Sequence, residues 1–341
     1  MLASFRLREA ATGKSVGGRI ETRHMVNKMN GKVKFGVRIH QRNYSFEALK
    51  RIWQEADRLG YHSATLFDLL NGPLLECWTT LSALAAVTEQ IRLTPIVLAN
   101  TYRPPALLAK MASTLDVISS GRLELGIGAG GGRGDHQASG YPFPSTRVRV
   151  QMLEEAMEVI KRLWTQPKAD FQGRFYTLDQ AVNEPKPVQQ PHPPILIGGH
   201  GETYLLRAVA KYGDICNIGS EMSLEEQRAK LGVLERHCRE VGRDPAEIEV
   251  THNARAIIAE SQREFDTIAA QSASQAGMSL SEFKQSISGA IAGTPEQCIR
   301  QIEPYVQAGI KYFFLIFPDP VSVESLQLFA SEVMPHFATQ S

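Results

Sequence analysis

The sequence has almost no excess charge and no long apolar run. It contains 37 Lys and Arg against 36 Asp and Glu in 341 residues, a formal net charge of +1. This balance argues against the basic surface that a nucleic-acid partner needs. No stretch approaches the roughly 18 consecutive apolar residues that span a bilayer, so no membrane partner is expected either. The partner class that remains is a small-molecule substrate.

Cysteine is also scarce. No two of the four cysteines form a C-x-x-C pair; they are Cys77, Cys216, Cys238 and Cys298. This spacing predicts neither a disulfide framework nor a zinc site, and it favours reduced packing thiols in a cytoplasmic protein. Residues 1–32 are basic and polar and lack the apolar segment of a secretory signal. We expect them to be a disordered extension, or the product of an upstream start codon, before a single domain over residues 33–341.

Glycine is concentrated within the segment Gly121–Phe143, GRLELGIGAGGGRGDHQASGYPF, which opens with the alternating apolar residues of a strand. Such a density of glycine is expected where φ is positive or another group approaches the backbone closely. Three of the glycines fit G-x-G-x-x-G, but that fingerprint requires a helix to begin at the glycines. No helical pattern starts before Thr146. The segment therefore predicts a strand that ends in a long glycine loop over a ligand.

Strand and helix patterns alternate from residue 33 onward. Eight apolar strand patterns are each followed by a helical one, and they cover residues 34–40, 63–68, 92–98, 123–128, 194–199, 214–220, 247–258 and 311–317. Ser45 and Thr294 are predicted N-caps, the second with Gln297 as its capping-box partner. Near-continuous apolar runs indicate buried parallel strands. The pattern predicts an α/β protein with a (β/α)8 TIM barrel and a helical insertion after strand 7, at about residues 262–290; a doubly wound open sheet is the alternative.

Groups able to act as acid or base are few at the predicted strand ends. They include His40, Asp68 and His136, which are the candidates for catalysis. The set shows no recognisable Ser/His/Asp or Cys/His arrangement, no paired carboxylates and no spacing typical of metal ligands. No metal is therefore expected. Such a set is typical of an enzyme that takes its reactivity from an organic cofactor.

A phosphate site is predicted after the fifth strand. In the segment ILIGGHGETYLL, glycines 198, 199 and 201 follow a strand, and Glu202 and Thr203 open a predicted helix. Backbone N–H groups of such a loop point at an anion, with the helix dipole behind them. The alternative is an ordinary tight turn between strand and helix.

Three segments together resemble the luciferase-like flavin and deazaflavin oxidoreductases. They are RLTPIVLANTYRPPALLAKMASTLDVISSGRLELGIGAG from Arg92, PPILIGGHGETYLLRAVAKYGDICN from Pro193, and AGTPEQCIRQIEPYVQAGIKYFFLIF from Ala292. Within that group the chain is most similar to the probable coenzyme F420-dependent oxidoreductases, from about Lys34 to Pro335. The resemblance implies a (β/α)8 barrel with an insertion after the seventh strand, in agreement with the strand pattern.

The resemblance also implies roles for individual residues. Asp68 matches an acid beside the cofactor ring, and Ile96 and Val97 match a pair joined by a non-proline cis peptide behind that ring. The loop after the fifth strand matches the segment whose backbone holds the cofactor phosphate. The implied cofactor-binding residues are Asp68, Ile96, Val97, Gly128, Gly130, Gly199, His200, Gly201 and Glu202.

Two positions depart from the family pattern. Many F420-dependent members have histidine after the strand-two acid and tryptophan or an acid after G-x-G-A, where this chain has Leu69 and Gly131 with Gly132. The usual proton donors are therefore absent. His40 and His136 are the available substitutes, each either a catalyst or a structural hydrogen-bonding residue. The predicted substrate-side residues are Arg103, Tyr141, Phe143 and Arg147.

Three functions follow as hypotheses. The first is an F420-dependent oxidoreductase that transfers a hydride between the deazaflavin C5 and a small organic substrate. The second keeps the fold and replaces the cofactor with FMN, as a monooxygenase that uses O₂ and a separate flavin reductase. The third is a non-catalytic protein that binds flavin or deazaflavin. The family resemblance also implies a homodimer.

Overall fold

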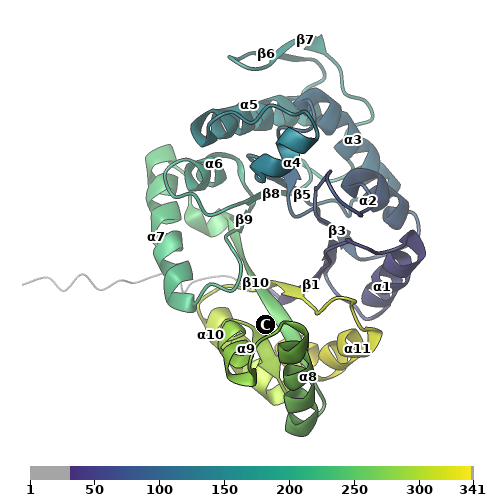
Figure 1. Cartoon of the computed structure of the whole chain (residues 1–341). Coiled ribbons are helices and arrows are strands. Elements are labelled where there is room, and N and C mark those ends of the chain that lie inside the picture. Colours follow the sequence, from purple (N-terminus) through teal and green to yellow (C-terminus); the bar gives the residue numbers. More distant parts are fainter. Residues whose placement is uncertain (1–30, 339–341) are drawn as a thin grey trace, which may run out of the picture.

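The computed structural model describes residues 31–338, so nearly all of the predicted extension over residues 1–32 lies outside the described residues. Parallel strands form a ring surrounded by helices (Figure 1). The strands of the ring are β1 (Lys34–Arg38), β2 (Ser63–Thr65), β3 (Arg92–Leu93), β4 (Leu98–Ala99), β5 (Leu125–Gly128), β8 (Ile195–Gly198), β9 (Ile215–Asn217), β10 (Glu249–Ile258) and β12 (Tyr312–Ile316). This confirms the predicted (β/α)8 barrel in place of a doubly wound open sheet.

The ring closes at a break in the third predicted strand. The sequence predicts one strand over residues 92–98, whereas the structure divides it into β3 and β4. β3 pairs with β2, and its Leu93 also forms an isolated parallel bridge with Leu123. β4 pairs with β5. The two halves of one strand thus join β2 to β5 and complete the circle.

The outer layer consists of amphipathic helices. They are α1 (Phe46–Arg58), α2 (Cys77–Ala85), α3 (Pro105–Ile118), α5 (Thr146–Thr165), α6 (Leu205–Tyr212), α7 (Leu224–Val241), α10 (Pro295–Gln307), α11 (Val323–Glu332) and α12 (Met334–Ala338). The predicted caps are present: the Ser45 side chain accepts the N–H of Ala48 at 3.2 Å, and Gln297 accepts that of Thr294 at 2.9 Å. None of the helices within residues 31–338 is both long and apolar enough to cross a membrane.

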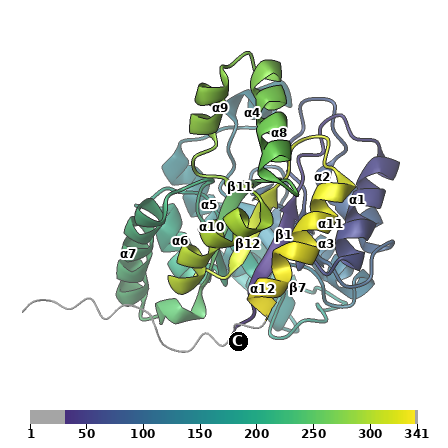
Figure 2. The ribbon, with the colours of Figure 1, turned by 90° about the horizontal axis from the view of Figure 1, so that it is seen from below.

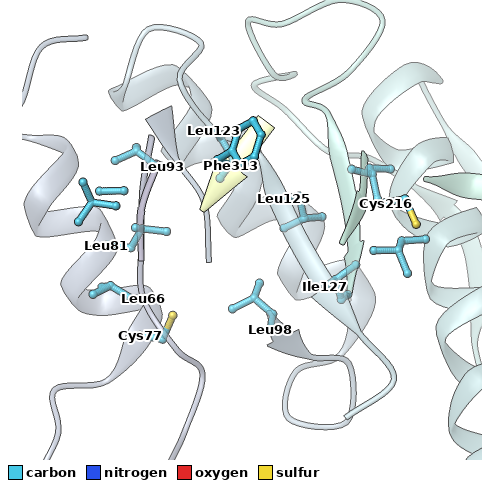
Figure 3. Packing of buried hydrophobic residues seen from close by; sticks show 14 of the residues in the cluster. Leu66, Cys77, Leu81, Leu93, Leu98, Leu123, Leu125, Ile127, Cys216 and Phe313 are labelled. Carbon is cyan, nitrogen blue, oxygen red and sulfur yellow. The ribbon is translucent and has the colours of Figure 1, made fainter. Parts of the chain in front are cut away.

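The apolar core has two layers because each barrel strand is buried on both faces. Outward-pointing residues pack beneath the helices, among them Leu125, Ile127 and Phe313 (Figure 3). A smaller cluster lies inside the ring and contains Ile96, Leu196, Ile215, Tyr312 and Phe314. All four cysteines are buried and free, as expected for packing thiols.

Two segments leave the ring, and the second is the predicted helical insertion. A two-stranded hairpin of β6 (Ala169–Gln172) and β7 (Thr177–Ala181) follows α5. The insertion after the seventh strand of the barrel contains α8 (Gln262–Gln275) and α9 (Leu280–Ser286), which have an apolar cluster of their own. They project from one end of the barrel (Figure 2). β11 (Ile291–Gly293) leads back into the barrel by pairing with the end of β10, and a short 3-10 helix, Pro245–Glu247, precedes β10.

A third segment corrects the sequence analysis. The short helix α4 (Arg133–Ala138) begins directly after the glycine run, where no helix is predicted before Thr146. Six residues are too few to show a helical period, and the N-cap position is Gly132, at a φ of 69°, which offers no side chain. α4 brings His136 and Asp135 back toward the barrel mouth, which an extended loop would not do.

Candidate active site

The floor of the barrel mouth is built around the break in the third strand. The Ile96–Val97 peptide bond is cis, as the resemblance implies for this pair. The chain leaves the regular ladder here, so the N–H of Ala99 needs an acceptor on the side facing β2. The carboxylate of Asp68 supplies it, at 2.8 Å. Asp68 therefore takes the place of a strand neighbour and holds β4 in position.

The same break explains part of the glycine run. A Cβ on Gly126 would collide with the carbonyl oxygen of Pro95. A Cβ on Gly128 would lie 2.9 Å from Val97 Cγ2 and 3.1 Å from the carbonyl oxygen of Gly198. Glycine in β5 therefore makes room inside the ring for the break, a packing role that the predicted ligand loop does not include.

A cavity of about 590 Å³ opens above this floor, at the carboxyl ends of the strands. This is the face at which the active sites of (β/α)8 barrels lie. Most of the predicted cofactor-binding residues line it: Asp68, Ile96, Val97, Gly128, Gly130, Gly199, His200 and Gly201. The exception is the side chain of Glu202, which is ion-paired with Lys230 of α7 and is not part of the lining.

Asp68 is paired with an arginine that the sequence analysis places on the substrate side. Arg103 donates to the two oxygens of Asp68 at 2.8 and 2.9 Å, and to Glu76 at 2.7 Å. Burial would lower the pKa of Arg103, but these carboxylates outweigh it and raise the pKa above its usual value. Arg103 is not part of the cavity lining, so its predicted substrate role is not supported. Since each oxygen of Asp68 already accepts a hydrogen bond, the arrangement favours a positioning role for Asp68 over the predicted catalytic one.

His136 is buried and satisfied at both ring nitrogens. Nδ1 lies 3.0 Å from the carbonyl oxygen of Gly132, and Nε2 lies 2.6 Å from Thr101 Oγ1. A carbonyl only accepts, so Nδ1 carries the hydrogen and Nε2 accepts from the threonine hydroxyl. His136 is fully buried and is absent from the cavity lining. The geometry therefore favours the structural alternative for this residue.

The other predicted residues also lie outside the lining. His40 packs its ring on Phe67, with centroids 4.7 Å apart; burial and then Arg42 lower its pKa. Tyr141 and Phe143 pack around Tyr102 and His136 in the loop that holds α4. Arg147 lies at a separate small hollow. None of the four is part of the cavity lining, so for Tyr141, Phe143 and Arg147 the predicted substrate-side role is not supported.

Two lining arginines were missed by the sequence analysis. Arg149 of α5 donates to the carbonyl oxygens of Gly130 and Pro144, at 3.2 and 2.5 Å. Arg38, the last residue of β1, donates to Ser220 Oγ at 3.0 Å. Neither forms an ion pair with any residue between 31 and 338, and burial lowers the pKa of both, that of Arg38 to about 10. Arg38 could have been found from the sequence, because it is a charged residue between two apolar ones within the predicted first strand.

The predicted phosphate loop has free donors. The backbone N–H groups of residues 200–204 donate no hydrogen bond to another residue in the described range. The loop ends at the N-terminus of α6, which begins at Leu205 rather than at the predicted Glu202 and Thr203. Unpaired N–H groups and the positive end of the helix dipole together suit an anion.

The lining as a whole is positive and poor in acid–base groups. Its one acid, Asp68, is paired, its one histidine is the exposed His200, and its two arginines have no counter-ion among the described residues. No group of three or more His, Cys, Asp or Glu side chains within residues 31–338 is placed to hold a metal ion. Such a cavity can bind a ligand that carries anionic groups, and it offers the ligand little acid–base chemistry of its own.

Comparisons with known proteins agree with this architecture. The chain is 27% identical to the F420-dependent glucose-6-phosphate dehydrogenase of Amycolatopsis mediterranei over 277 residues, 74% of this chain and 81% of that protein. It is 31% identical to the pyrimidine monooxygenase RutA of Allorhizobium ampelinum over 214 residues, 59% of this chain and 57% of that protein.

Among solved structures, the monooxygenase RslO1 of Streptomyces bottropensis superposes with a TM-score of 0.76 at 24% identity. The match covers 89% of this chain and all of that one (100%). This likeness shows the same fold. The family model described as luciferase-like monooxygenase matches residues 32–312. A match over this much of the chain, on a barrel with the strand break and mouth cavity described above, places the protein in the luciferase-like monooxygenase family.

Proposed function

We propose that the protein is an oxidoreductase that uses coenzyme F420 and transfers a hydride between the deazaflavin C5 and a small organic substrate. The observation that carries the proposal is the positive cavity at the barrel mouth, with Ile96 and Val97 at its floor. A relative named for its F420 dependence, aligned over 81% of its length, adds support.

The residues present fit this cofactor. Ile96, Val97 and Gly128 would form the surface under the planar ring, since Gly128 has no side chain to raise the floor. The free N–H groups of residues 200–204 would hold the phosphate, and Arg149 would add a charge to it. Asp68 and Arg103 would keep the strand break in place beneath the ring.

Basic residues at the cavity mouth favour F420 over FMN. Arg147 and Arg207 share a hollow of about 120 Å³ with Tyr204 and Glu154, next to the phosphate loop, and Glu154 is ion-paired with Lys211 at 3.5 Å. Arg133 lies near enough to Arg149 to lower its pKa further, after burial. None of these three mouth arginines is ion-paired with a residue of the described range. F420 extends beyond its phosphate into an oligoglutamyl tail, whereas FMN ends at the phosphate, so free arginines at this place suit the longer anion.

The protein itself needs to contribute little to the reaction. Bound F420 supplies two-electron hydride transfer, so the protein must align the reactants and provide at most one proton. Leu69 and Gly131, which replace the usual proton donors, both line the cavity. His200 is exposed, lines the cavity and forms no hydrogen bond with a described residue. We propose it as the group that exchanges that proton, in place of His40 and His136.

An FMN-dependent monooxygenase is the second candidate. It is favoured by the relative named as a pyrimidine monooxygenase, at 31% identity. The phosphate loop and Arg149 would hold FMN equally well, and reduced flavin would come from a separate reductase. A non-catalytic protein that binds flavin or deazaflavin would keep the cavity and show no turnover.

Equilibrium binding of the purified protein to F420, to FMN and to the deazaflavin riboside without phosphate and tail tests the proposal. We expect F420 to bind at least about 10-fold more tightly than FMN. The double variant R147M/R207M should lose most of that preference, while R51M, which removes an exposed charge on α1, should keep it. Preference for FMN would favour the monooxygenase and make O₂ consumption the next assay. Binding of none of the three ligands would overturn both enzyme proposals.

A further inference from the structure

We propose that the substrate carries an anionic group, a carboxylate or a phosphate, and that Arg38 binds it. That the bound anion is a substrate rests on the proposed function. The anion site itself rests on the geometry of the cavity. It assigns a role to a lining residue that the proposed cofactor site does not use.

Arg38 is held in place, and none of the residues that the structure describes forms an ion pair with it. Its guanidinium lies 4.8 Å from the centre of the Phe67 ring and donates to Ser220 Oγ at 3.0 Å. Phe67 is itself fixed, because the Gln41 side-chain amide bonds to both its carbonyl oxygen, at 2.6 Å, and its N–H, at 3.0 Å. The Nε of Arg38 is buried and has no hydrogen-bond partner in the described part of the chain. An oriented cation with an unused buried donor is a site for an anion.

The acids next to these contacts are paired with other arginines. Asp68 follows Phe67 and is bound by Arg103 through both oxygens. Glu221 follows Ser220 and is bound by Arg255, which also reaches the carbonyl oxygen of Ser286 at the end of α9. The acids that follow the two contact residues of Arg38 are therefore occupied, and no ion pair joins Arg38 to another residue between 31 and 338. We assign its counter-charge to a ligand.

Arg38 and the proposed phosphate loop start from different strands of the ring. Arg38 ends β1, whereas the phosphate loop follows β8, and these two strands lie on opposite sides of the ring. Arg149 contacts Gly130 and Pro144 on the β5 side, and Arg38 contacts Ser220 after β9. Both arginines line one cavity. A cofactor whose phosphate lies at the loop would therefore leave Arg38 for a second anion, that of the substrate.

Paired ligands of equal shape and different charge test this directly. The probes are benzoate and benzamide, titrated into protein that is saturated with F420 or, if FMN is preferred, with FMN. Binding is followed by cofactor fluorescence and calorimetry. We expect wild-type protein to bind benzoate at least about 10-fold more tightly than benzamide, the value of one charge-assisted hydrogen bond. R38M should lose this preference, and R38K should keep part of it, since lysine retains the charge without the planar fork.

Two controls make the result specific. R51M removes an equal charge from the outer surface of α1 and should behave as wild type. The cofactor dissociation constant should change by less than about 3-fold in R38M, which retains an apolar contact with Phe67. A 10-fold loss of cofactor affinity in R38M with the benzoate preference intact would show that Arg38 holds the cofactor, and would overturn the proposal. So would equal binding of benzoate and benzamide to wild type.

The cofactor-free protein separates this inference from the proposed function. Thermal shift with benzoate and benzamide needs no cofactor, and comparison of R38M with R149M shows which arginine is responsible. If neither F420 nor FMN binds while the benzoate preference persists and depends on Arg38, the cofactor assignment fails and the anion site stands. If F420 or FMN binds and benzoate is not preferred over benzamide, the cofactor assignment stands and the anion site fails.

Discussion

His136 is buried and bonded at both ring nitrogens, whereas His200 is exposed and lines the cavity. Replacing His136 with alanine removes a buried ring, leaves Thr101 Oγ1 without its imidazole partner and takes one of several donors from the Gly132 carbonyl. We expect a loss of about 3 kcal/mol in the free energy of unfolding, measured by urea denaturation. His200→Ala should change that value by less than about 0.5 kcal/mol, since the side chain is exposed. If H136A unfolds as wild type does, the structural assignment is wrong.

His200 is the residue proposed to exchange the substrate proton. If His200 exchanges the substrate proton, H200A should lower kcat by about 10² or more and leave the cofactor dissociation constant within about 3-fold. The measurement is steady-state kinetics beside cofactor titration. An unchanged kcat would remove His200 from the mechanism and leave solvent as the proton source.

The side chain of Asp68 forms an ion pair with Arg103 and also accepts a hydrogen bond from the backbone of β4. In Asp68→Asn the amide oxygen can still accept the N–H of Ala99, but Arg103 loses its buried counter-charge. We expect a destabilisation of about 3 kcal/mol, as for other broken buried pairs. The matched control is Glu47→Gln, which breaks the exposed pair with Lys50 and should cost less than about 1 kcal/mol. Equal effects of the two variants in urea denaturation would contradict this view of Asp68.

At the scale of elements, the strand break and β5 depend on each other. Gly128→Ala places a methyl group 2.9 Å from Val97 Cγ2 and 3.1 Å from the Gly198 carbonyl oxygen, so β4, β5 or β8 must shift. We expect a destabilisation of about 2 kcal/mol and a weaker affinity for the cofactor, because the shifted strands form the cavity floor. Thermal unfolding and cofactor titration measure the two effects.

The control for this prediction lies three residues away. A Cβ on Gly131 meets nothing within 4 Å, although Gly131 also lines the cavity. Gly131→Ala should therefore leave stability nearly unchanged. If G128A proves as harmless as G131A, the close approach of β5 to the strand break is not a constraint on the fold.

At the scale of the whole molecule, one buried acid ties several strands together at the amino-terminal end of the barrel. Glu124 accepts from Arg92 Nε at 2.7 Å, from Thr94 Oγ1 at 2.8 Å and from the Tyr312 hydroxyl at 2.9 Å. Burial would raise its pKa, but the nearby His62 and the hydrogen bonds from Arg92 and Thr94 outweigh this and lower the pKa to about 2. The network lies opposite the cavity and serves stability.

This network predicts a pH dependence of stability. A carboxyl whose pKa is lower in the folded than in the unfolded state stabilises the fold above its unfolded pKa, about 4.3, and loses that contribution as the pH falls toward 2. Glu124→Gln should therefore lower the free energy of unfolding by about 3 kcal/mol at pH 7. The gap between wild type and variant should narrow at pH 3, as measured by urea denaturation at both values. A gap that is constant with pH would show that Glu124 does not act through its charge.

The division between sequence and structure follows from the range of the interactions. Helix periods, caps and apolar strands are local, so the order of eight strands and helices, the Ser45 cap and the insertion could be predicted from the residues. The family resemblance added the cis bond between Ile96 and Val97. The phosphate loop was predicted from its glycines, and its role stays a prediction. The site residues were predicted less well, because a strand-end position shows that a side chain is near the mouth but does not show what it bonds to.

The sequence by itself determined the barrel, the balance of charge and the segments that meet at its mouth, since these depend on periodicity and composition. Only the tertiary structure decided which polar groups are free. Asp68 and Arg103 come from two different strand ends and neutralise each other, and His136 returns on a short helix to be buried. Among residues 31–338, Arg38 and Arg149 have no counter-ion, and the one acid in the cavity lining, Asp68, is paired with Arg103. Pairing between distant segments is a property of the folded chain, and it leaves this cavity positive.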